Sequence, residues 1–310
     1  MITFDKLKIV ADISTIEIYD QSRFEVIIKN GVVTALKFYQ ELPYLLMIKV
    51  DYQNREVVVE FSGKVLGKDY PQLISIKTIR RCFENINALC FCSLDVEAMM
   101  DSDVVKCDVT KDVRIQDVPK LTQYVRNHIS NYQQYLCRKM RNGNLVVEKN
   151  VVSRKTKKRM TIYDKEKEMH RAENEAFVEA NGLEGAFDGM CRFELNLDSK
   201  EQIRQALHVH NTKLMTVLSA NANPIADFLD NVVLSESESI SIPDKKTYIM
   251  TLVLKDCDYD LEKVEAKMRS FIQSKGTSIK SVMKPYIALL GQMNSDDGMD
   301  LWQDARRKLT

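Results

Sequence analysis

Residues 157–168 read Lys-Lys-Arg-Met-Thr-Ile-Tyr-Asp-Lys-Glu-Lys-Glu, and they contain the end of one secondary-structure element and the start of another. Apolar and polar side chains alternate up to Tyr163, which is the pattern of a half-buried strand. Residues 165–180 carry apolar side chains at helical spacing among many charges, and Gly182 follows as a stop signal. The stretch therefore predicts a strand over about 158–163 that leads into a charged helix.

Similar strands and helices are predicted on both sides of this stretch. Residues 23–29 and 32–38 are rich in β-formers and meet at Asn30-Gly31, which is a strong hairpin signal. Residues 44–52 and 56–61 predict a second hairpin. The other predicted elements are helices over 75–89, 94–100, 119–136, 200–208 and 222–232, and strands over 103–110, 144–152 and 189–197. We therefore expect an α+β fold with a largely antiparallel sheet and flanking helices.

The chain changes character after this region. Residues 235–243 form a polar, serine-rich stretch that ends in proline. Residues 246–255 fit either a helix or a strand, and amphipathic helices are predicted over 260–274, 278–292 and 298–308. We therefore expect a domain over 1–234 and a small helical C-terminal subdomain over 235–310.

The charge of the chain is unevenly distributed. The 310 residues include 45 Lys and Arg and 44 Asp and Glu, so the net charge of +1 does not indicate a nucleic-acid partner. Between Arg138 and Arg159, however, there are nine basic residues and one acid, Glu148. Such a cluster is typical of a phosphate-binding surface, and a solvated charged hairpin is the alternative. The predicted DNA-binding residues are Arg138, Lys139, Arg141, Arg154, Lys155, Lys157 and Lys158.

The cysteines and the apolar runs indicate the cellular compartment. The seven cysteines are scattered and lack the paired spacing of a zinc finger, so we expect reduced thiols in a cytosolic protein. No signal peptide is evident, and no apolar run approaches the roughly 18–20 residues of a membrane span. We expect a cytoplasmic protein without a membrane partner.

Tyr163 is the candidate nucleophile. Lys157, Lys158, Arg159 and Lys165 flank it in the sequence. Nearby positive charge lowers the cost of a phenolate and also attracts a phosphodiester, so this arrangement suits attack on a nucleic-acid backbone. A structural tyrosine at a strand end is the alternative.

Three acidic residues lie on predicted strands in apolar surroundings, namely Glu60, Asp108 and Glu194. If they converge, they would need a divalent cation to offset their repulsion, and such oxygen ligands suit Mg²⁺ or Mn²⁺. Asp112 is a candidate additional ligand, and a strand-end or helix-cap acid is the alternative that we favour. Solvent-facing carboxylates are the alternative for each of them.

Other residues offer competing sites. His208-Val209-His210 has the spacing of a paired-imidazole metal site, and its use would shift the nucleophile to a later residue such as Tyr248. The alternative is a pair of histidines at a helix end. Tyr132 and Tyr135 are candidates for stacking on single-stranded bases, and helix packing is their alternative.

Three short motifs occur in order along the chain. They are Lys106-Cys-Asp108-Val-Thr110-Lys-Asp112, then Arg159-Met-Thr-Ile-Tyr163-Asp-Lys165-Glu-Lys-Glu168, then Arg192-Phe-Glu194 before a helix. Glu60-Phe-Ser-Gly-Lys64-Val-Leu-Gly67 precedes them. Over residues 50–210 this order resembles the gene II/X family of replication proteins of filamentous phages and small plasmids. It is more distantly similar to trans-acting plasmid rolling-circle initiators.

The resemblance implies a Rep-like, HUH-type endonuclease domain that nicks one strand of origin DNA. It implies that the tyrosine stays attached to the 5′ phosphate and that the strand is later rejoined, with Mg²⁺ or Mn²⁺ as cofactor. Carried over by motif, the catalytic residues are Tyr163, Arg159, Lys165 and Glu168, and the metal ligands are Asp108, Glu194 and Glu60.

The expected partners follow from the same resemblance. Origin DNA would be double-stranded with a locally single-stranded nick site, in the cytoplasm of a bacterial host. Because the chain lacks a Gly-x-x-x-x-Gly-Lys-Ser/Thr loop, a host helicase and polymerase would unwind and copy the DNA. Paired origin repeats would favour a homodimer. The alternatives are a non-catalytic origin-binding protein and a relaxase for plasmid mobilisation.

Overall fold

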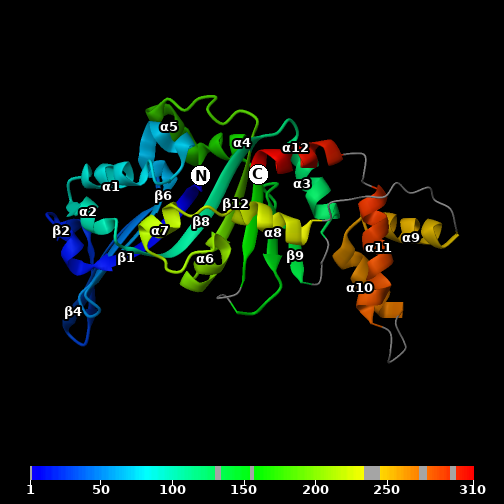
Figure 1. The fold of residues 1–310 in the computed structure, drawn as a ribbon, viewed down its shortest axis with the longest axis horizontal. Coiled ribbons are helices and arrows are strands. Elements are labelled where there is room, and N and C mark those ends of the chain that lie inside the picture. Colours follow the sequence, from blue (N-terminus) through cyan, green and yellow to red (C-terminus); the bar gives the residue numbers. More distant parts are fainter. Residues whose placement is uncertain (1, 130–133, 154–156, 234–244, 272–277, 294–297) are drawn as a thin grey trace.

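The computed structural model describes residues 2–129, 134–153, 157–233, 245–271, 278–293 and 298–310. Within these residues, ten strands form one sheet in the order β3-β4-β5-β6-β1-β8-β12-β11-β10-β9, and all neighbouring strands are antiparallel (Figure 1). The strands are β1 (Phe4–Asp12), β3 (Glu25–Lys29), β4 (Val32–Gln40), β5 (Leu46–Asp51), β6 (Glu56–Ser62), β8 (Asp103–Arg114), β9 (Tyr135–Lys139), β10 (Leu145–Lys149), β11 (Arg159–Asp164) and β12 (Met190–Leu197). A separate pair joins β2 (Ile16–Ile18) to β7 (Cys92–Leu94). The predicted α+β fold with a largely antiparallel sheet is confirmed.

The predicted hairpins are present. Asn30 and Gly31 have φ values of 52° and 77°, the positive values that a tight turn between twisted strands requires at both central positions. The turn joins β3 to β4, and residues 52–55 join β5 to β6. Short-range turn chemistry therefore accounts for these two hairpins.

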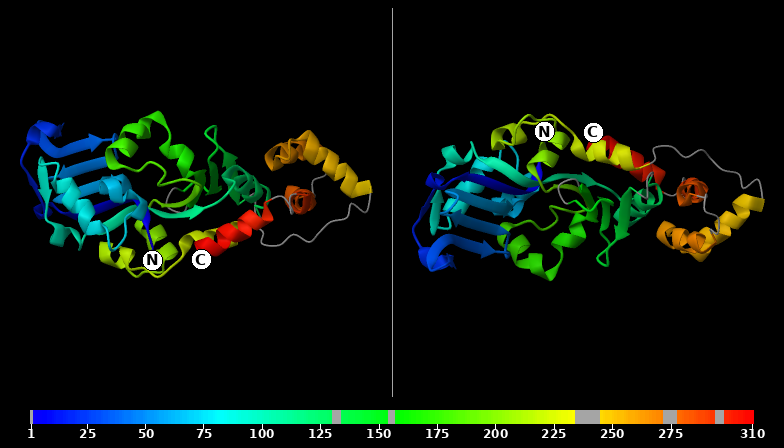
Figure 2. Two further views of the ribbon diagram at one scale, coloured as in Figure 1. Left: turned by 90° about the horizontal axis from the view of Figure 1, so that it is seen from above. Right: turned by 90° about the horizontal axis from the view of Figure 1, so that it is seen from below.

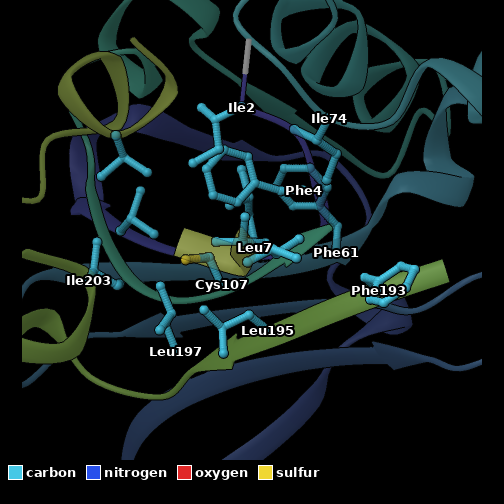
Figure 3. Packing of buried hydrophobic residues seen from close by; sticks show 14 of the residues in the cluster. Ile2, Phe4, Leu7, Phe61, Ile74, Cys107, Phe193, Leu195, Leu197 and Ile203 are labelled. Carbon is cyan, nitrogen blue, oxygen red and sulfur yellow. The ribbon is translucent and has the colours of Figure 1, made fainter. Parts of the chain in front are cut away.

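The sheet has one apolar face and one polar face. On the apolar face, Leu7, Phe61, Cys107 and Phe193 are fully buried and contribute to the main core (Figure 3). Alternate residues on the same strands point the other way, because side chains in a strand alternate between faces. The polar face carries Lys6, Lys8, Asp108, Asp112, Arg192 and Glu194, and the candidate site lies there.

Helices lie on both faces. The helices α8 (Pro224–Val232) and α12 (Met299–Leu309) lie on the apolar face, and α4 (Lys165–Met169) and α5 (Ala172–Asn181) lie on the opposite side (Figure 2). The other helices of this body are α1 (Ile79–Asn87), α2 (Val96–Met99), α3 (Val118–Asn127), α6 (Lys200–Leu207), α7 (Leu214–Leu218) and the 3₁₀ helices η1 (Ile13–Thr15), η2 (Gln21–Arg23) and η3 (Gly63–Gln72). Ser199 caps α6 as predicted, because its hydroxyl accepts a hydrogen bond from the backbone N–H of Gln202.

Two predicted helices differ from the structure. The helix expected over 119–136 ends at Asn127, and Tyr135–Lys139 form β9, because pairing with β10 satisfies their backbone groups. The helix expected over 165–180 is divided into α4 and α5 at Arg171, whose backbone is extended. The amide of Asn174 holds this corner by donating a hydrogen bond of 2.6 Å to the carbonyl of Glu168.

The C-terminal helices divide into two groups. The helices α9 (Lys245–Asp256), α10 (Leu261–Phe271) and α11 (Ile279–Met293) pack on one another in a small cluster of their own. The helix α12 instead returns to the sheet, where Trp302, Ala305 and Leu309 join the main core. The predicted subdomain over 235–310 therefore does not include its last helix, and the predicted boundary after residue 234 lies outside the described residues. Among the helices that the structure describes, none combines the length and the apolar character needed to cross a bilayer.

All seven cysteines are free thiols, as predicted for reduced cysteines. Five of them are buried, Cys137 is half-buried and Cys90 is exposed. The buried cysteines contribute to packing, and none of the seven forms a covalent cross-link.

Candidate active site

Tyr163 is the last residue but one of β11, on the polar face of the sheet. It lies directly opposite Arg192 of β12, and its hydroxyl donates a hydrogen bond of 3.4 Å to Oε2 of Glu194. The residue is 8% exposed. Burial raises the pKa of Tyr163 well above its usual value of 10, although Arg192 opposes the shift. The phenol is therefore neutral at neutral pH, and its use as a nucleophile would require a proton acceptor close by.

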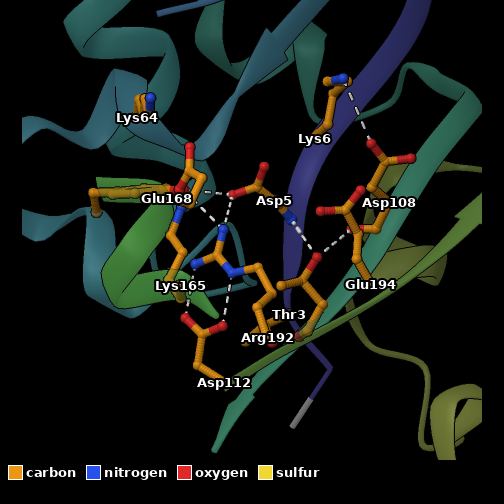
Figure 4. Close-up of polar contacts among 12 residues, drawn as sticks. Thr3, Asp5, Lys6, Lys64, Asp108, Asp112, Lys165, Glu168, Arg192 and Glu194 are labelled. Atoms are coloured by element: carbon orange, nitrogen blue, oxygen red, sulfur yellow. Dashed lines mark hydrogen bonds and ion pairs between the residues drawn. The ribbon is translucent and has the colours of Figure 1, made fainter. Parts of the chain in front are cut away.

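Arg192 organises the floor of the site. Its guanidinium is fully buried and forms a two-point ion pair with Asp112, with both N–O distances at 2.7 Å (Figure 4). Nη1 also donates to Asp5 Oδ1 at 2.5 Å and to the hydroxyl of Tyr70 at 2.8 Å. A buried cation of this kind persists only when its charge is matched, and the two carboxylates match it. Asp112 is thus an ion-pair partner of Arg192.

Lys165 extends the same network from the first turn of α4. Its ammonium group donates to the hydroxyl of Tyr70 at 2.8 Å and pairs closely with Glu168. Burial and the nearby Arg192 lower the pKa of Lys165 to about 8. The lysine and Glu168, both predicted from the tyrosine motif, are therefore neighbours in the site.

Asp108 and Glu194 lie together beside this network. The side-chain amide of Asn196 donates to Asp108 at 2.7 Å and to Glu194 at 3.2 Å. Burial raises the pKa of Glu194 to about 7, with Asp108 and Asp5 as the next causes, and burial also raises the pKa of Asp108. Lys6 pairs with Asp108 at 3.6 Å, and the carboxylates around it raise the pKa of Lys6 although burial opposes this.

Glu60 is not joined to these two carboxylates. It lies on the same face of the sheet, but it stands opposite Lys8 and pairs with it at 3.1 Å. Glu60 and Glu194 are separated by three strand spacings across the sheet and by about four residues along the strands. These spacings correspond to a distance of roughly 20 Å between the two positions. Among the described residues, no group of three or more His, Cys, Asp or Glu side chains is arranged to hold a metal ion.

A divalent cation nevertheless fits the remaining pair. Asp108 and Glu194 are buried carboxylates that share one amide donor, and both have raised pKa values. A cation between them would relieve their repulsion and favour their charged forms. The residues available for Mg²⁺ or Mn²⁺ are therefore Asp108 and Glu194, without Glu60.

The hydroxyl of Tyr163 belongs to an open cleft. The cavity measures about 670 Å³. Six of its lining residues carry hydroxyl or charged groups, namely Tyr163, Lys165, Glu168, Lys64, Tyr39 and Tyr44. Tyr39 is 56% exposed at the cleft, while Lys64 is bound to Asn174 at 2.5 Å. The site thus offers a buried phenol at the edge of a space large enough for part of a nucleotide chain.

The basic segment lies elsewhere. Arg159 is four residues before Tyr163 on the same strand, which places it roughly 13 Å away. Lys157 and Arg138 both pair with Glu148, at 3.1 Å and 3.8 Å. Arg138, Lys139 and Arg141 are exposed, Lys157 and Lys158 are half-buried, and Arg154 and Lys155 lie outside the described residues. Lys157, Lys158 and Arg159, which precede Tyr163 in the sequence, are therefore remote from its hydroxyl. The cation opposite Tyr163 is Arg192 of β12.

The described residues of the competing sites lie outside the cleft that contains Tyr163. His208 ends α6 and lies 3.9 Å from Asp227, and His210 contacts the side chain of Asn211. Tyr135 packs edge-on against Phe228 with ring centres 5.7 Å apart, and Tyr132 lies outside the described residues. Tyr248 is exposed on α9.

Sequence reasoning missed several residues of the site. Asp5 and Lys6 of β1, Tyr70 of η3 and Asn196 of β12 all contact its charged groups. A signal was available for two of them, because Lys6 and Asn196 each lie an even number of residues from another polar residue on their strand. Nothing in the local sequence marks Tyr70, whose contacts come from distant segments.

The chain was compared with protein-family models, with curated proteins and with solved structures, and none of the three comparisons found a match.

Proposed function

We propose that the protein is a tyrosine-dependent DNA strand transferase of the rolling-circle initiator type, built on an initiator-like nuclease domain. The observation that carries the proposal is the contact between Tyr163 and Glu194 at the edge of a cleft. A buried carboxylate with a raised pKa beside a hydroxyl in a cleft is an arrangement that often marks a functional site. The ordered motifs around Asp108, Tyr163 and Glu194 support the same conclusion.

The chemistry requires one proton transfer and one exchange of bonds. Glu194 accepts the phenol proton through Oε2, because this oxygen already accepts the hydrogen bond of the Tyr163 hydroxyl. The oxygen of Tyr163 then bonds to the phosphorus, and the bond from phosphorus to the 3′ oxygen breaks. The departing 3′ oxygen takes up a proton, and the 5′ phosphate stays on the tyrosine. Because the number of phosphoester bonds is unchanged, a 3′ hydroxyl can reverse the reaction and rejoin the strand.

Other residues would bind and orient the DNA. Lys165 and Lys64 line the cleft where a phosphate would lie. Arg192, on the neighbouring strand β12, would stabilise negative charge on the Tyr163 oxygen. Tyr39 provides an exposed ring for stacking of one base. Held by Asp108 and Glu194, Mg²⁺ or Mn²⁺ would polarise a phosphate oxygen.

The proposal is tested by capture of DNA on the protein. A library of single strands of random sequence, labelled at the 3′ end, is incubated with the protein and Mn²⁺ and then run on a denaturing gel. We expect label on the wild-type protein, because cleavage leaves the 3′ part of the strand attached. The Tyr163→Phe variant should lose this label by about 10³-fold or more.

The matched control is Tyr39→Phe, which removes a hydroxyl from the same cleft but keeps the ring. The Tyr39→Phe variant should retain the adduct. Chelation of the metal with EDTA should abolish the adduct of the wild-type protein. Equal labelling of the wild type and Tyr163→Phe would refute the nucleophile. Stable DNA complexes without any adduct would identify a non-catalytic origin-binding protein instead.

A further inference from the structure

A second cavity lies behind the catalytic network, on the outer side of α4 and α5. It measures about 410 Å³, and its floor is apolar. The floor consists of Met169, Val178, Leu183 and Phe187. Phe187 and Met169 also pack around Tyr70, so the floor is firmly supported from below.

Carboxylates surround this floor. The rim carries Glu166, Glu175, Glu179, Glu184 and Asp188, with His170 as the basic residue among them. Glu166 accepts a hydrogen bond of 2.8 Å from the backbone N–H of Gly189. In the described part of the chain, the other four carboxylates form no salt bridge, and all four side chains are exposed. We call this site the acidic pocket. Its chemistry suits a partner surface with apolar side chains at its centre and cations around them.

The chain itself carries such a surface on α9. Tyr248, Ile249 and Leu252 are 57%, 48% and 47% exposed, and they lie next to one another on this helix. Lys245, Lys246 and Lys255 are exposed near the two ends of the same helix. The opposite side of α9 packs on α10 and α11 through Met250 and Leu254. An exposed apolar stripe of this kind on a helix commonly marks an interface.

The two surfaces are far apart in one molecule. The α9 helix lies at one end of the elongated shape, beyond α11, whereas α4 and α5 lie over the central part of the sheet (Figures 1 and 2). The helix of one chain is therefore not positioned to fill the pocket of the same chain. A second copy of the chain supplies the complementary surface without this restriction.

We propose that the protein forms a dimer in which α9 of each copy docks into the acidic pocket of the other. The apolar stripe would cover the floor formed by Met169 and Phe187. The lysines would lie against the rim carboxylates. A two-fold arrangement fills both pockets at once and closes the assembly, so it does not continue into filaments. This proposal does not depend on the nicking reaction, because it concerns a surface on the far side of α4.

The test uses two charge reversals in the full-length chain. The pocket variant carries Glu175→Lys and Glu179→Lys, and the helix variant carries Lys245→Glu and Lys246→Glu. Each variant alone places like charges at both contacts, so we expect its dimer dissociation constant to rise by about tenfold or more in sedimentation velocity. In an equimolar mixture, both contacts regain opposite charges, and we expect a mixed dimer close to the wild type in strength.

The controls separate this contact from general effects of charge. The double variant Glu25→Lys, Glu84→Lys makes the same change in net charge as the pocket variant, but on exposed residues elsewhere. It should leave association unchanged. Restoration by the mixture also shows that both variants are folded. A wild-type chain that stays monomeric at all concentrations would overturn the proposal. So would single variants that associate like the wild type, or a mixture that fails to restore the dimer. No DNA is present, so the result is independent of the adduct experiment.

Discussion

At the level of single residues, the site depends on carboxylates in two electrostatic states. Asp5 is beside Arg192, and this guanidinium lowers the pKa of Asp5 although burial opposes the shift. Glu194 lacks such a direct cation pair, so burial dominates and its pKa rises to about 7. The same sheet face therefore holds one acid whose pKa is lowered and one that can exchange a proton near neutral pH. This difference suits Glu194 to accept the proton of Tyr163.

The raised pKa of Glu194 predicts a specific pH dependence of stability. Its pKa in the folded state, about 7, lies above the ordinary value of 4.5, so the folded state holds the proton more tightly between these values. The free energy of unfolding should therefore fall as pH rises from about 4.5 to about 7, by about 3 kcal/mol at most from this group. Glu194→Gln should remove that part of the fall, as measured by urea unfolding at pH 5 and pH 8.

The matched control for this prediction is Glu60→Gln. Glu60 lies on the same sheet face but is paired with Lys8, so its replacement should leave the fall between pH 5 and pH 8 as in the wild type. If Glu194→Gln loses as much stability over this range as the wild type does, the assignment of a raised pKa to Glu194 is wrong.

At the level of secondary-structure elements, local signals predicted most elements correctly. Asn30-Gly31, Ser199 and Gly182 each act within a few residues, and the turn, the helix cap and the helix end occur where their chemistry predicts them. The strand β9 was missed because residues 135–139 gain their hydrogen bonds from β10, and no signal within the segment shows this pairing. Strand pairing at the edge of the sheet overrode the expected continuation of the helix.

Gly182 allows a direct test of one such element. It ends α5 with φ at 61°, and an added Cβ would meet nothing within 4 Å. The cost of Gly182→Ala should therefore come from the backbone alone, about 1 kcal/mol of unfolding free energy in urea. Gly182→Asn should cost less, because asparagine tolerates the left-handed conformation better. Equal losses for the two variants would show that contacts of the side chain, rather than the backbone, set the cost.

At the level of the whole molecule, the last helix packs against the main core rather than against the other C-terminal helices. The helix α12 packs on α3 and β8, and Lys111 of β8 donates a hydrogen bond of 2.5 Å to the carbonyl of Leu309. The helices α9–α11 have a separate core, which contacts the main body through His128 and Gly291 at 2.8 Å. The chain thus leaves the main body after α8 and returns to it at α12.

Trp302, the single tryptophan, reports on this arrangement. It is buried in the main core, so its fluorescence should shift on unfolding together with the sheet. Leu309→Ala should lower the free energy of unfolding measured by Trp302 fluorescence by about 2–5 kcal/mol, because it opens a cavity beneath α12.

Val264→Ala is the control, since this residue is buried in the α9–α11 core. It should leave the unfolding transition of Trp302 nearly unchanged. A loss equal to that of Leu309→Ala would mean that the two cores unfold as one unit.

The sequence alone predicted the features that depend on residues close together in the chain. These include the alternation of β11, the hairpins, the capped helices, and the choice of Tyr163, Asp108 and Glu194 by motif. Folding alone decided which of these residues meet. Arg192 and Asp5 are 187 positions apart, yet they form an ion pair, whereas Arg159 is four positions from Tyr163 and is remote from its hydroxyl. The physical reason is that pairing between strands distant in the chain follows the order and register of the whole sheet, whereas local turns specify only the hairpins.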